Sequence, residues 1–264
     1  MHIVICIKQV VDPDGVNSYA LWGRLEIEDD GHTIKNDLPL IINAYDDQAL
    51  EAALRIRDDG VDCQLTAITA GSEEAGAVIK HAVAMGADES ILIEDSKSGA
   101  ADGFRTGRLL AAAIRELGDV DLVLCGRQAS DGDQGTVPAV IAEELDAAYV
   151  TLASDVRMDG DAVKITCATA AGEEILMADT PVVVTVSNEL GIPRYPTSKG
   201  MMAARRQPPT VRPAADLVSD GAHTVELVEL FVPEVQGNCE IIEGDSPASK
   251  AETLFKHLEE AGVL

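Results

Sequence analysis

The sequence predicts an α/β protein with a doubly wound, mostly parallel sheet. Short continuous apolar runs, typical of strands buried on both faces, alternate four times with amphipathic helical patterns between residues 3 and 145. Residues 149–177 instead alternate apolar and polar side chains, as antiparallel strands do. We therefore expect a mostly parallel sheet with an antiparallel excursion, followed by an extended C-terminal arm.

The first half of the chain supplies the alternation. Residues 3–7 form an apolar β-branched run, and Lys8 stands where the carboxyl end of that strand would open. Residues 11–40 are polar and irregular, which favours a hairpin excursion with short β-like pieces such as Leu25-Glu26-Ile27. The next elements expected are helix 47–58, strand 64–70, a helix capped by Ser72 and ending at Gly86, strand 90–93, helix 102–117 and strand 120–125.

A glycine-rich loop joins the strand ending at Cys125 to a helix that opens near Thr136. Gly126, Gly132 and Gly135 let the backbone bend and approach a ligand where a Cβ would clash. The first turn of the helix leaves amide N–H groups unpaired, and the positive end of the helix dipole suits an anion such as a phosphate.

Other residues of the loop have two interpretations. Thr136 is a candidate helix cap, Pro138 is tolerated in the first turn, and Arg127 is the fixed cation nearby. Spacing alone equally allows a simple βα turn in which Asp131 and Asp133 cap the helix, because the loop is neither a GxGxxG motif nor a P-loop.

The second half departs from the alternation. Strands are expected over residues 149–158, 162–168 and 173–177, with a hairpin turn at Asp159-Gly160, and a buried strand over 181–186. Prolines 193, 196, 208, 209 and 213 then predict an arm without regular elements after Ser187. Ser249 is expected to cap a final helix through Leu258.

The net charge of −26 arises from 46 acidic against 20 basic residues. Binding to nucleic acid or to an anionic membrane needs a basic face, so both kinds of partner are excluded. The acidic residues are spread along the chain, which resembles the surfaces of proteins from salt-loving organisms, where molar salt screens self-repulsion. No apolar stretch approaches the length of a membrane span and no leader pattern is seen, so a cytoplasmic protein is expected.

Cysteine and histidine give no sign of a metal or nucleophilic centre. Cys6, Cys125 and Cys167 fall in strand-like runs and are expected to be buried thiols, while Cys63 and Cys239 also stand alone. The histidines, at positions 2, 32, 81, 223 and 257, are scattered without neighbours at metal-ligand spacing and are expected to be structural. Ser130 and Cys125 have no nearby base in sequence, so no catalytic residue is predicted.

Two motifs resemble the β subunit of electron-transferring flavoproteins. CGRQASDGDQGTVP, residues 125–138, resembles the adenine-nucleotide loop of that family, and SNELGIPRYPTSKGMMAARR, residues 187–206, resembles its signature and partner-recognition loop. IVICIKQV and NAYDDQALEAALRI are also similar, so the resemblance runs in order from residue 3 to about residue 206.

The resemblance implies a Rossmann-like sheet of the adenine nucleotide alpha hydrolase type. It implies a nucleotide-binding domain over residues 1–190, and a recognition loop and C-terminal arm over 191–264 that pack on a partner α subunit. The implied function is electron carriage within a heterodimer, from a dehydrogenase or NADH towards a quinone oxidoreductase or another acceptor. The main FAD would be held by the α subunit or shared with it, and this subunit would bind AMP or a second FAD.

The resemblance also assigns residues. Those expected to bind the nucleotide are Cys6, Asn43, Ala44, Tyr45, Asp46, Ala70, Asp102, Thr106, Gly126, Arg127, Gln128, Ala129, Asp131, Gly132, Asp133, Gln134, Gly135, Thr136 and Val137. Those expected to dock a dehydrogenase are Arg194, Tyr195, Pro196, Ser198, Lys199, Gly200, Met201 and Met202.

Departures from the family pattern bear on two of these expectations. The short Asp131-Gly132-Asp133 loop, with Asp102 and Thr106, resembles the electron-bifurcating members that hold a second FAD, although Gly103 stands where those members usually have Thr. FAD is the interpretation we favour over AMP. Ser198 occupies the position of the family's leucine anchor, with Met201-Met202 as a candidate replacement surface.

Two other functional classes remain open at this stage. A stand-alone nucleotide-binding enzyme, such as an ATP-dependent ligase or pyrophosphatase, could use the same sheet, but the chain has no P-loop and no basic cluster for a transferring phosphate. An ATP-sensing module would leave the segment after Ser187 unexplained.

Overall fold

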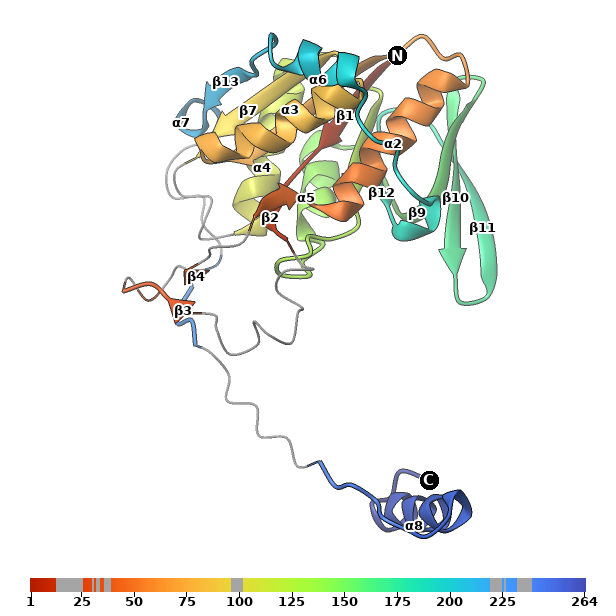
Figure 1. Cartoon of the computed structure of the whole chain (residues 1–264). Helices are drawn as coiled ribbons and strands as arrows, with labels where there is room; N and C mark the ends of the chain where they lie inside the picture. Colours follow the sequence, from red (N-terminus) through yellow and green to blue (C-terminus); the bar gives the residue numbers. More distant parts are fainter. Residues whose placement is uncertain are drawn as a thin grey trace. The chain divides into compact units, whose positions relative to one another are not determined.

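The computed structural model describes residues 1–12, 26–29, 31, 34–35, 39–95, 102–218, 225, 227–231 and 239–264. A nine-stranded sheet with the strand order β11-β10-β9-β12-β8-β1-β6-β7-β13 forms its centre (Figure 1). Most neighbouring strands in that order are parallel, so the predicted α/β class with a mostly parallel sheet is confirmed.

Five parallel strands form the middle of the sheet. They are β1 (His2–Cys6), β6 (Gln64–Gly71), β7 (Glu89–Glu94), β8 (Leu122–Gly126) and β12 (Val182–Val186). Every residue of β8 and β12 is buried, as their continuous apolar sequences predict. The chain proceeds from β1 to β6 and β7 on one side, and then returns to place β8 on the other side of β1. The strand order therefore reverses between β1 and β8.

The helices cover both faces of this sheet (Figure 1). They are α2 (Ala44–Asp58), α3 (Gly76–Met85), α4 (Gly103–Glu116) and α5 (Thr136–Leu145). Helices α2 and α3 pack with Ile3 and Ile5 in one apolar core, whereas α4 and α5 pack with Val4 and Cys6 in another. Alternate residues of β1 thus serve opposite cores, which makes the fold doubly wound.

The antiparallel excursion is also present. Strand β9 (Ala148–Asp159) pairs in parallel with β12 at its start, and then pairs antiparallel with β10 (Ala162–Thr169). Strand β11 (Gly172–Ala178) completes the hairpin at the edge of the sheet. Nearer the N-terminus, β2 (Gln9–Val11) pairs antiparallel with β5 (Leu40–Ile42), and β3 (Glu26–Ile27) with β4 (Ile34–Lys35). Leu25 of the predicted excursion lies outside the described residues, as do His32 and His223.

The expectation that the arm after Ser187 has no regular element before the final helix is wrong. A short 3-10 helix η3 (Asn188–Leu190), helix α6 (Ser198–Ala204), strand β13 (Thr210–Pro213) and helix α7 (Ala214–Leu217) are present. Strand β13 joins the sheet beside β7 as its edge strand. Proline is tolerated there, because an edge strand has a side with no ladder hydrogen bonds to donate.

Three predicted helix starts also need correction. Helix α2 begins at Ala44 rather than near Asp47, because the Asn43 carbonyl accepts the first-turn N–H groups of Asp46 and Asp47. The Ser72 side chain makes no cap hydrogen bond, and a 3-10 turn, η1 (Glu73–Ala75), precedes α3. The N-cap of α5 is Gly135, so Thr136 is its first helical residue and not its cap.

The chain forms two compact units, Met1–Leu230 and Phe231–Leu264. In the second unit, α8 (Pro247–Glu260) is capped by Ser246 and not by Ser249. Ser249 completes a capping box, because its N–H donates to Ser246 Oγ at 3.2 Å and its own Oγ accepts the Ser246 N–H at 3.4 Å. The functional boundary expected at residue 190 stays a prediction. None of the helices in the described ranges is long and apolar enough to cross a lipid bilayer.

Candidate functional site

A pocket of about 130 Å³ opens at the carboxyl edge of the sheet, where the strand order reverses between β1 and β8. Open α/β sheets bind ligands at such reversals, because the loops leaving the two strands diverge there. The space is about ten times what a single water molecule needs. The lining residues are Cys6, Ile7, Lys8, Asn43, Asp46, Ala70, Gly103, Thr106, Leu110, Cys125, Gly126, Gln128, Ala129, Gln134, Val137 and Pro138.

Asp46 joins the two strands that flank the reversal. It lies in the first turn of α2 and is 7% exposed. Its Oδ2 accepts the backbone N–H of Lys8 at 2.8 Å, and its Oδ1 accepts that of Gly126 at 2.9 Å. Burial raises the pKa of Asp46 from 3.8 to about 7, although its hydrogen bonds to Lys8, Asn43 and Gly126 act in the opposite direction.

Asn43 holds the glycine-rich loop against the start of α2. Its Nδ2 donates to the carbonyl of Gln128 at 2.8 Å, and its Oδ1 accepts the N–H of Ser130 at 3.2 Å. Asn43 is buried, so both hydrogen bonds are shielded from water. A single side chain thereby fixes the loop at two points.

The charged residues of the loop are paired, and neither aspartate caps α5. Lys8 Nζ contacts Asp131 Oδ1 at 2.7 Å, so Arg127 is not the only cation beside the loop. Gln128 donates to Asp133 Oδ1 at 2.8 Å. Asp133 has a φ of 50°, a left-handed conformation that aspartate tolerates better than most residues. These contacts reduce the repulsion that the two carboxylates would exert on an anion.

The start of α5 has the features of an anion site. Gly135, its N-cap, has no side chain with which to occupy the first-turn N–H groups. A Cβ at Gly135 would come within 2.8 Å of the Arg127 carbonyl oxygen. The close approach of the loop backbone at Gly135 to the Arg127 carbonyl therefore requires glycine. No side chain of the N-cap then covers the first-turn N–H groups of α5.

Gly126 has a stricter requirement. A Cβ at this position would lie 2.3 Å from Asp46 Oδ1 and 2.8 Å from the carbonyl carbon of Tyr45. The end of β8 thus approaches the backbone of α2 more closely than any side chain allows. This approach permits the hydrogen bond between the Gly126 N–H and Asp46.

Two thiols contribute to the pocket's apolar lining. Cys6 is the last residue of β1, Cys125 is the last but one of the neighbouring β8, and both are buried. A hydrogen bond with Cys6, together with burial, raises the pKa of the Cys125 thiol. The Cys125 thiol is therefore expected to stay protonated, and both buried side chains act as small apolar groups. Cys167 is buried as predicted, Cys63 is partly buried, and Cys239 is exposed.

The pocket brings together ten of the residues predicted to bind a nucleotide. They are Cys6, Asn43, Asp46, Ala70, Thr106, Gly126, Gln128, Ala129, Gln134 and Val137. It also includes six that were not predicted, namely Ile7, Lys8, Gly103, Leu110, Cys125 and Pro138. Five of these six lie within three residues of a predicted one, so widening each predicted segment would have found them. Leu110 faces the pocket only because α4 packs there.

The remaining predicted residues lie around the pocket without lining it. Ala44 and Tyr45 are in the first turn of α2, and Arg127 lies over the Tyr45 ring with its guanidinium carbon 5.6 Å from the ring centre. Asp102 is buried and caps α4, accepting the Phe104 N–H at 2.9 Å. The others, Asp131, Gly132, Asp133, Gly135 and Thr136, belong to the loop and the first residue of α5.

The predicted docking residues occupy a separate surface. Arg194, Tyr195 and Pro196 lie in an irregular segment, and Ser198, Lys199, Gly200, Met201 and Met202 lie in α6. Tyr195 is 86% exposed, and Met201 and Met202 are also exposed. Ile192, at 85% exposure, adds an apolar side chain that the sequence reasoning missed. The Arg194 guanidinium binds two carboxylates of α2.

Within the described part of the chain, no three His, Cys, Asp or Glu side chains are placed together to hold a metal ion. His2 Nε2 lies 2.8 Å from Thr66 Oγ1, and His81 Nε2 lies 3.0 Å from Asp47 Oδ1. These are contacts between neighbouring elements of the fold.

Known proteins are similar in sequence to this chain over most of its length. The family model of the electron transfer flavoprotein domain matches residues 31–217. The electron transfer flavoprotein subunit beta of Megasphaera elsdenii is 36% identical over 229 residues, covering 84% of this chain and 82% of that protein. The same subunit of Thermoanaerobacterium thermosaccharolyticum is 39% identical over 204 residues, covering 77% and 75%.

A further relative is named as a subunit of a complex. Subunit CarD of the caffeyl-CoA reductase-Etf complex of Acetobacterium woodii is 32% identical over 270 residues, covering 100% of both chains. The fold, the order of the motifs and these similarities agree, and the chain belongs to the electron transfer flavoprotein family as a subunit of the beta type.

Proposed function

We propose that this chain is the β subunit of a heterodimeric electron transfer flavoprotein and holds an adenine nucleotide in the pocket between β1 and β8. The observation that carries the proposal is the meeting of an apolar pocket with an uncapped helix start at the reversal of the strand order. An adenine ring needs the first feature and a phosphate needs the second.

The residues present fit such a ligand. Ala70, Leu110 and the two thiols supply an apolar surface for a planar ring. Ser130 Oγ is buried and has no hydrogen-bond partner among the residues that the structure describes, so the loop retains a polar group for a ligand or a water molecule. Both FAD and AMP carry the adenosine and phosphate that these features would recognise, and we favour FAD.

When bound, a flavin supplies the electron chemistry, accepting electrons from one partner and passing them to another. The chain's own residues bind and orient. Asp46 and Asn43 hold the backbone of the strand ends and of the loop, and the loop and the start of α5 present N–H groups to phosphate. The proposed route runs from a dehydrogenase or NADH, through a heterodimer with an α subunit, to a quinone oxidoreductase or another acceptor.

The proposal is tested by the nucleotide content of this chain co-expressed with its α subunit and purified in high salt. Acid release followed by chromatography should give two adenine nucleotides per heterodimer, either two FAD or one FAD and one AMP. Asn43→Ala should lower the occupancy of one of them and leave the other unchanged, because it removes both hydrogen bonds that hold the loop.

A matched control is Gln207→Ala. It also removes an amide that donates to a backbone carbonyl, that of Asp88, at 2.6 Å, but it lies outside the pocket. A chain that stays monomeric with its α subunit present, or a heterodimer with a single nucleotide, would overturn the proposal.

A further inference from the structure

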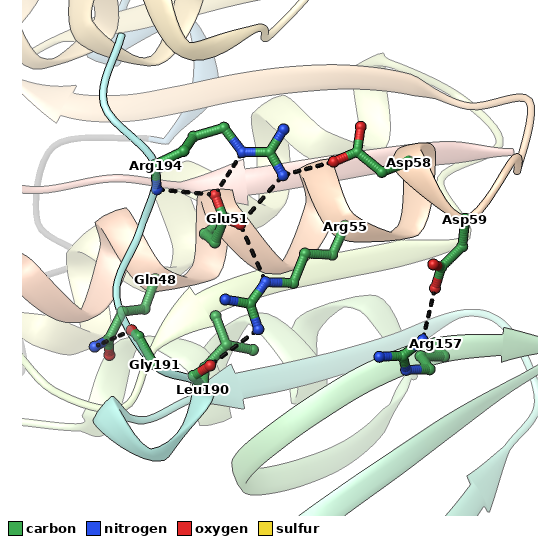
Figure 2. A network of polar contacts seen from close by, with 9 residues as sticks. All are labelled: Gln48, Glu51, Arg55, Asp58, Asp59, Arg157, Leu190, Gly191 and Arg194. Atoms are coloured by element: carbon green, nitrogen blue, oxygen red, sulfur yellow. Dashed lines mark hydrogen bonds and ion pairs between the residues drawn. The ribbon is translucent and has the colours of Figure 1, made fainter.

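One face of α2 binds the segment that precedes α6. Gln48, Glu51, Arg55 and Asp58 are spaced by three, four and three residues, so they form one stripe along the helix. Figure 2 shows this stripe directed at residues 190–194. The opposite stripe of α2 is buried in the core, so the helix carries a rigid polar ridge on its outer side.

Glu51 is the centre of the contact (Figure 2). Its Oε2 accepts the backbone N–H of Arg194 at 3.1 Å and the Arg194 Nε–H at 2.7 Å, and its Oε1 accepts an Nη2–H of Arg194 at 3.1 Å. This is the two-point geometry in which arginine binds carboxylates most specifically. The side chain of Glu51 is 7% exposed, so water competes little for these bonds.

The charges around Glu51 are balanced. Arg55 Nε donates to Glu51 Oε1 at 3.0 Å, and Arg194 Nη2 also donates to Asp58 Oδ2 at 2.7 Å. Two guanidinium groups thus meet two carboxylates. Burial alone would raise the pKa of Glu51, but the hydrogen bonds from Arg194 and Arg55 outweigh it and leave that pKa below its ordinary value.

The same stripe holds the backbone on the near side of Ile192. Arg55 Nη1 donates to the carbonyl of Leu190 at 2.9 Å, and Gln48 Nε2 donates to that of Gly191 at 3.3 Å. The stripe therefore binds the residues on both sides of Ile192, while Ile192 itself is 85% exposed.

The far end of the segment is fixed by α6. Thr197 caps this helix by accepting the Gly200 N–H at 3.0 Å. A Cβ at Gly200 would lie 2.0 Å from the carbonyl oxygen of Ala84, so α6 approaches α3 by direct backbone contact. The irregular segment between Gly191 and Thr197 is thus held at both ends, and its exposed apolar side chains are Ile192 and Tyr195.

We infer that Glu51 is a positioning residue for docking: through Arg194 it holds residues 191–197 so that Ile192 and Tyr195 are presented in one fixed geometry to a partner flavoprotein. The inference rests on the proposed function, since it assumes that this surface docks an electron-transfer partner. A segment ordered before binding loses less conformational freedom on docking, and affinity increases for that reason. Two exposed apolar residues on an irregular segment would otherwise bind weakly.

The test uses the heterodimer and hydrogen–deuterium exchange. Exchange of the Arg194 amide reports directly on the contact between Glu51 and Arg194, because this N–H donates to Glu51 Oε2. Glu51→Gln should accelerate exchange of this amide about 10- to 100-fold, as expected when a hydrogen bond to a charged group is lost. Amides of β12 should keep their protection.

Asp59→Asn is the matched control. It removes one negative charge at the end of the same helix and breaks a 3.1 Å pair with Arg157 on β9, without touching the docking segment. It should leave the exchange of the Arg194 amide unchanged. If Glu51→Gln does not fold, Arg194→Lys replaces it, since lysine keeps the charge and loses the two-point geometry.

Docking is measured as reduction of the heterodimer by a flavin-containing acyl-CoA dehydrogenase. Glu51→Gln should raise the apparent KM for the heterodimer about tenfold or more with little change in kcat. The inference would be overturned if exchange of the Arg194 amide were unchanged in Glu51→Gln, or if the amides of β12 lost as much protection. It would also be overturned if the Arg194 amide exchanged faster while the KM stayed the same. A wild-type heterodimer that docks no dehydrogenase would instead count against the proposed function, and the exchange experiment would still decide whether Glu51 holds the segment.

Discussion

Asp46 makes the pH dependence of stability a test of the site's electrostatics. Asp46→Asn preserves the size of the side chain but replaces one carboxylate oxygen with an NH2 group. In the wild type, the Asp46 carboxylate accepts two backbone N–H groups, from Lys8 and Gly126. An asparagine has a single side-chain oxygen and can accept only one of them in the same geometry. The orphaned amide should cost about 1–3 kcal/mol at any pH.

The ionisation of Asp46 adds a part that varies with pH. Its pKa is raised to about 7 in the folded protein, so the folded chain keeps this proton to a higher pH than the unfolded chain does. The stability contributed by protonated Asp46 is complete below a pH of 3.8 and is lost as the pH rises through about 7. Between about pH 5.5 and about pH 8 the wild type should lose about 2 kcal/mol from this group, and Asp46→Asn should lose none of it.

The assay is equilibrium urea unfolding of both proteins in high salt, followed by circular dichroism at several pH values. The part of the difference in unfolding free energy that does not vary with pH depends on which hydrogen bonds the asparagine makes. The part that varies with pH reports on the ionisation of the Asp46 carboxyl alone. The variant should gain on the wild type as the pH rises. A difference that stays constant across the range would refute the argument that burial of Asp46 outweighs its hydrogen bonds.

Three further predictions concern the fold around the pocket and the surface. Gly126→Ala should destabilise the protein by about 1–3 kcal/mol or more, since its Cβ would overlap Asp46. Gly132→Ala should be tolerated, because no atom of the described residues would lie within 4 Å of its Cβ. Thermal melting of both variants distinguishes a local clash from a general effect. Arg105→Met should lower the free energy of unfolding in urea by about 3–5 kcal/mol, because it removes the cation that lies 2.7 Å from the buried carboxylate of Asp95. A loss below about 1 kcal/mol would show that the pair is not needed for stability. With a net charge of −26, the fold should melt at a lower temperature in dilute buffer than in molar KCl, and equal melting temperatures would contradict this.

The central elements of the fold could be predicted because their signals are local. Every residue of β8 and β12 is buried, and burial on both faces is recorded directly in apolar runs such as Val182–Val186. Helix starts were less predictable. Asn43, Ser72 and Thr136 all resemble caps, and the choice among neighbouring positions depended on which carbonyl accepted the first N–H groups. The edge strand β13 was missed because prolines stand before it and at its end, and Pro213 suits an edge strand, which can be recognised only once the sheet is known.

By itself the sequence determined the α/β class, the acidic surface, the glycine-rich loop and, through its motifs, the family. The tertiary structure alone decided that the strand order reverses between β1 and β8, that Asp46 meets Gly126 across 80 residues, and that Glu51 meets Arg194 across 143. The physical reason is the range of the interactions. Periodicity and turn chemistry act between residues a few positions apart, whereas the strand order and the polar contacts of this protein depend on which distant segments the packed cores bring together.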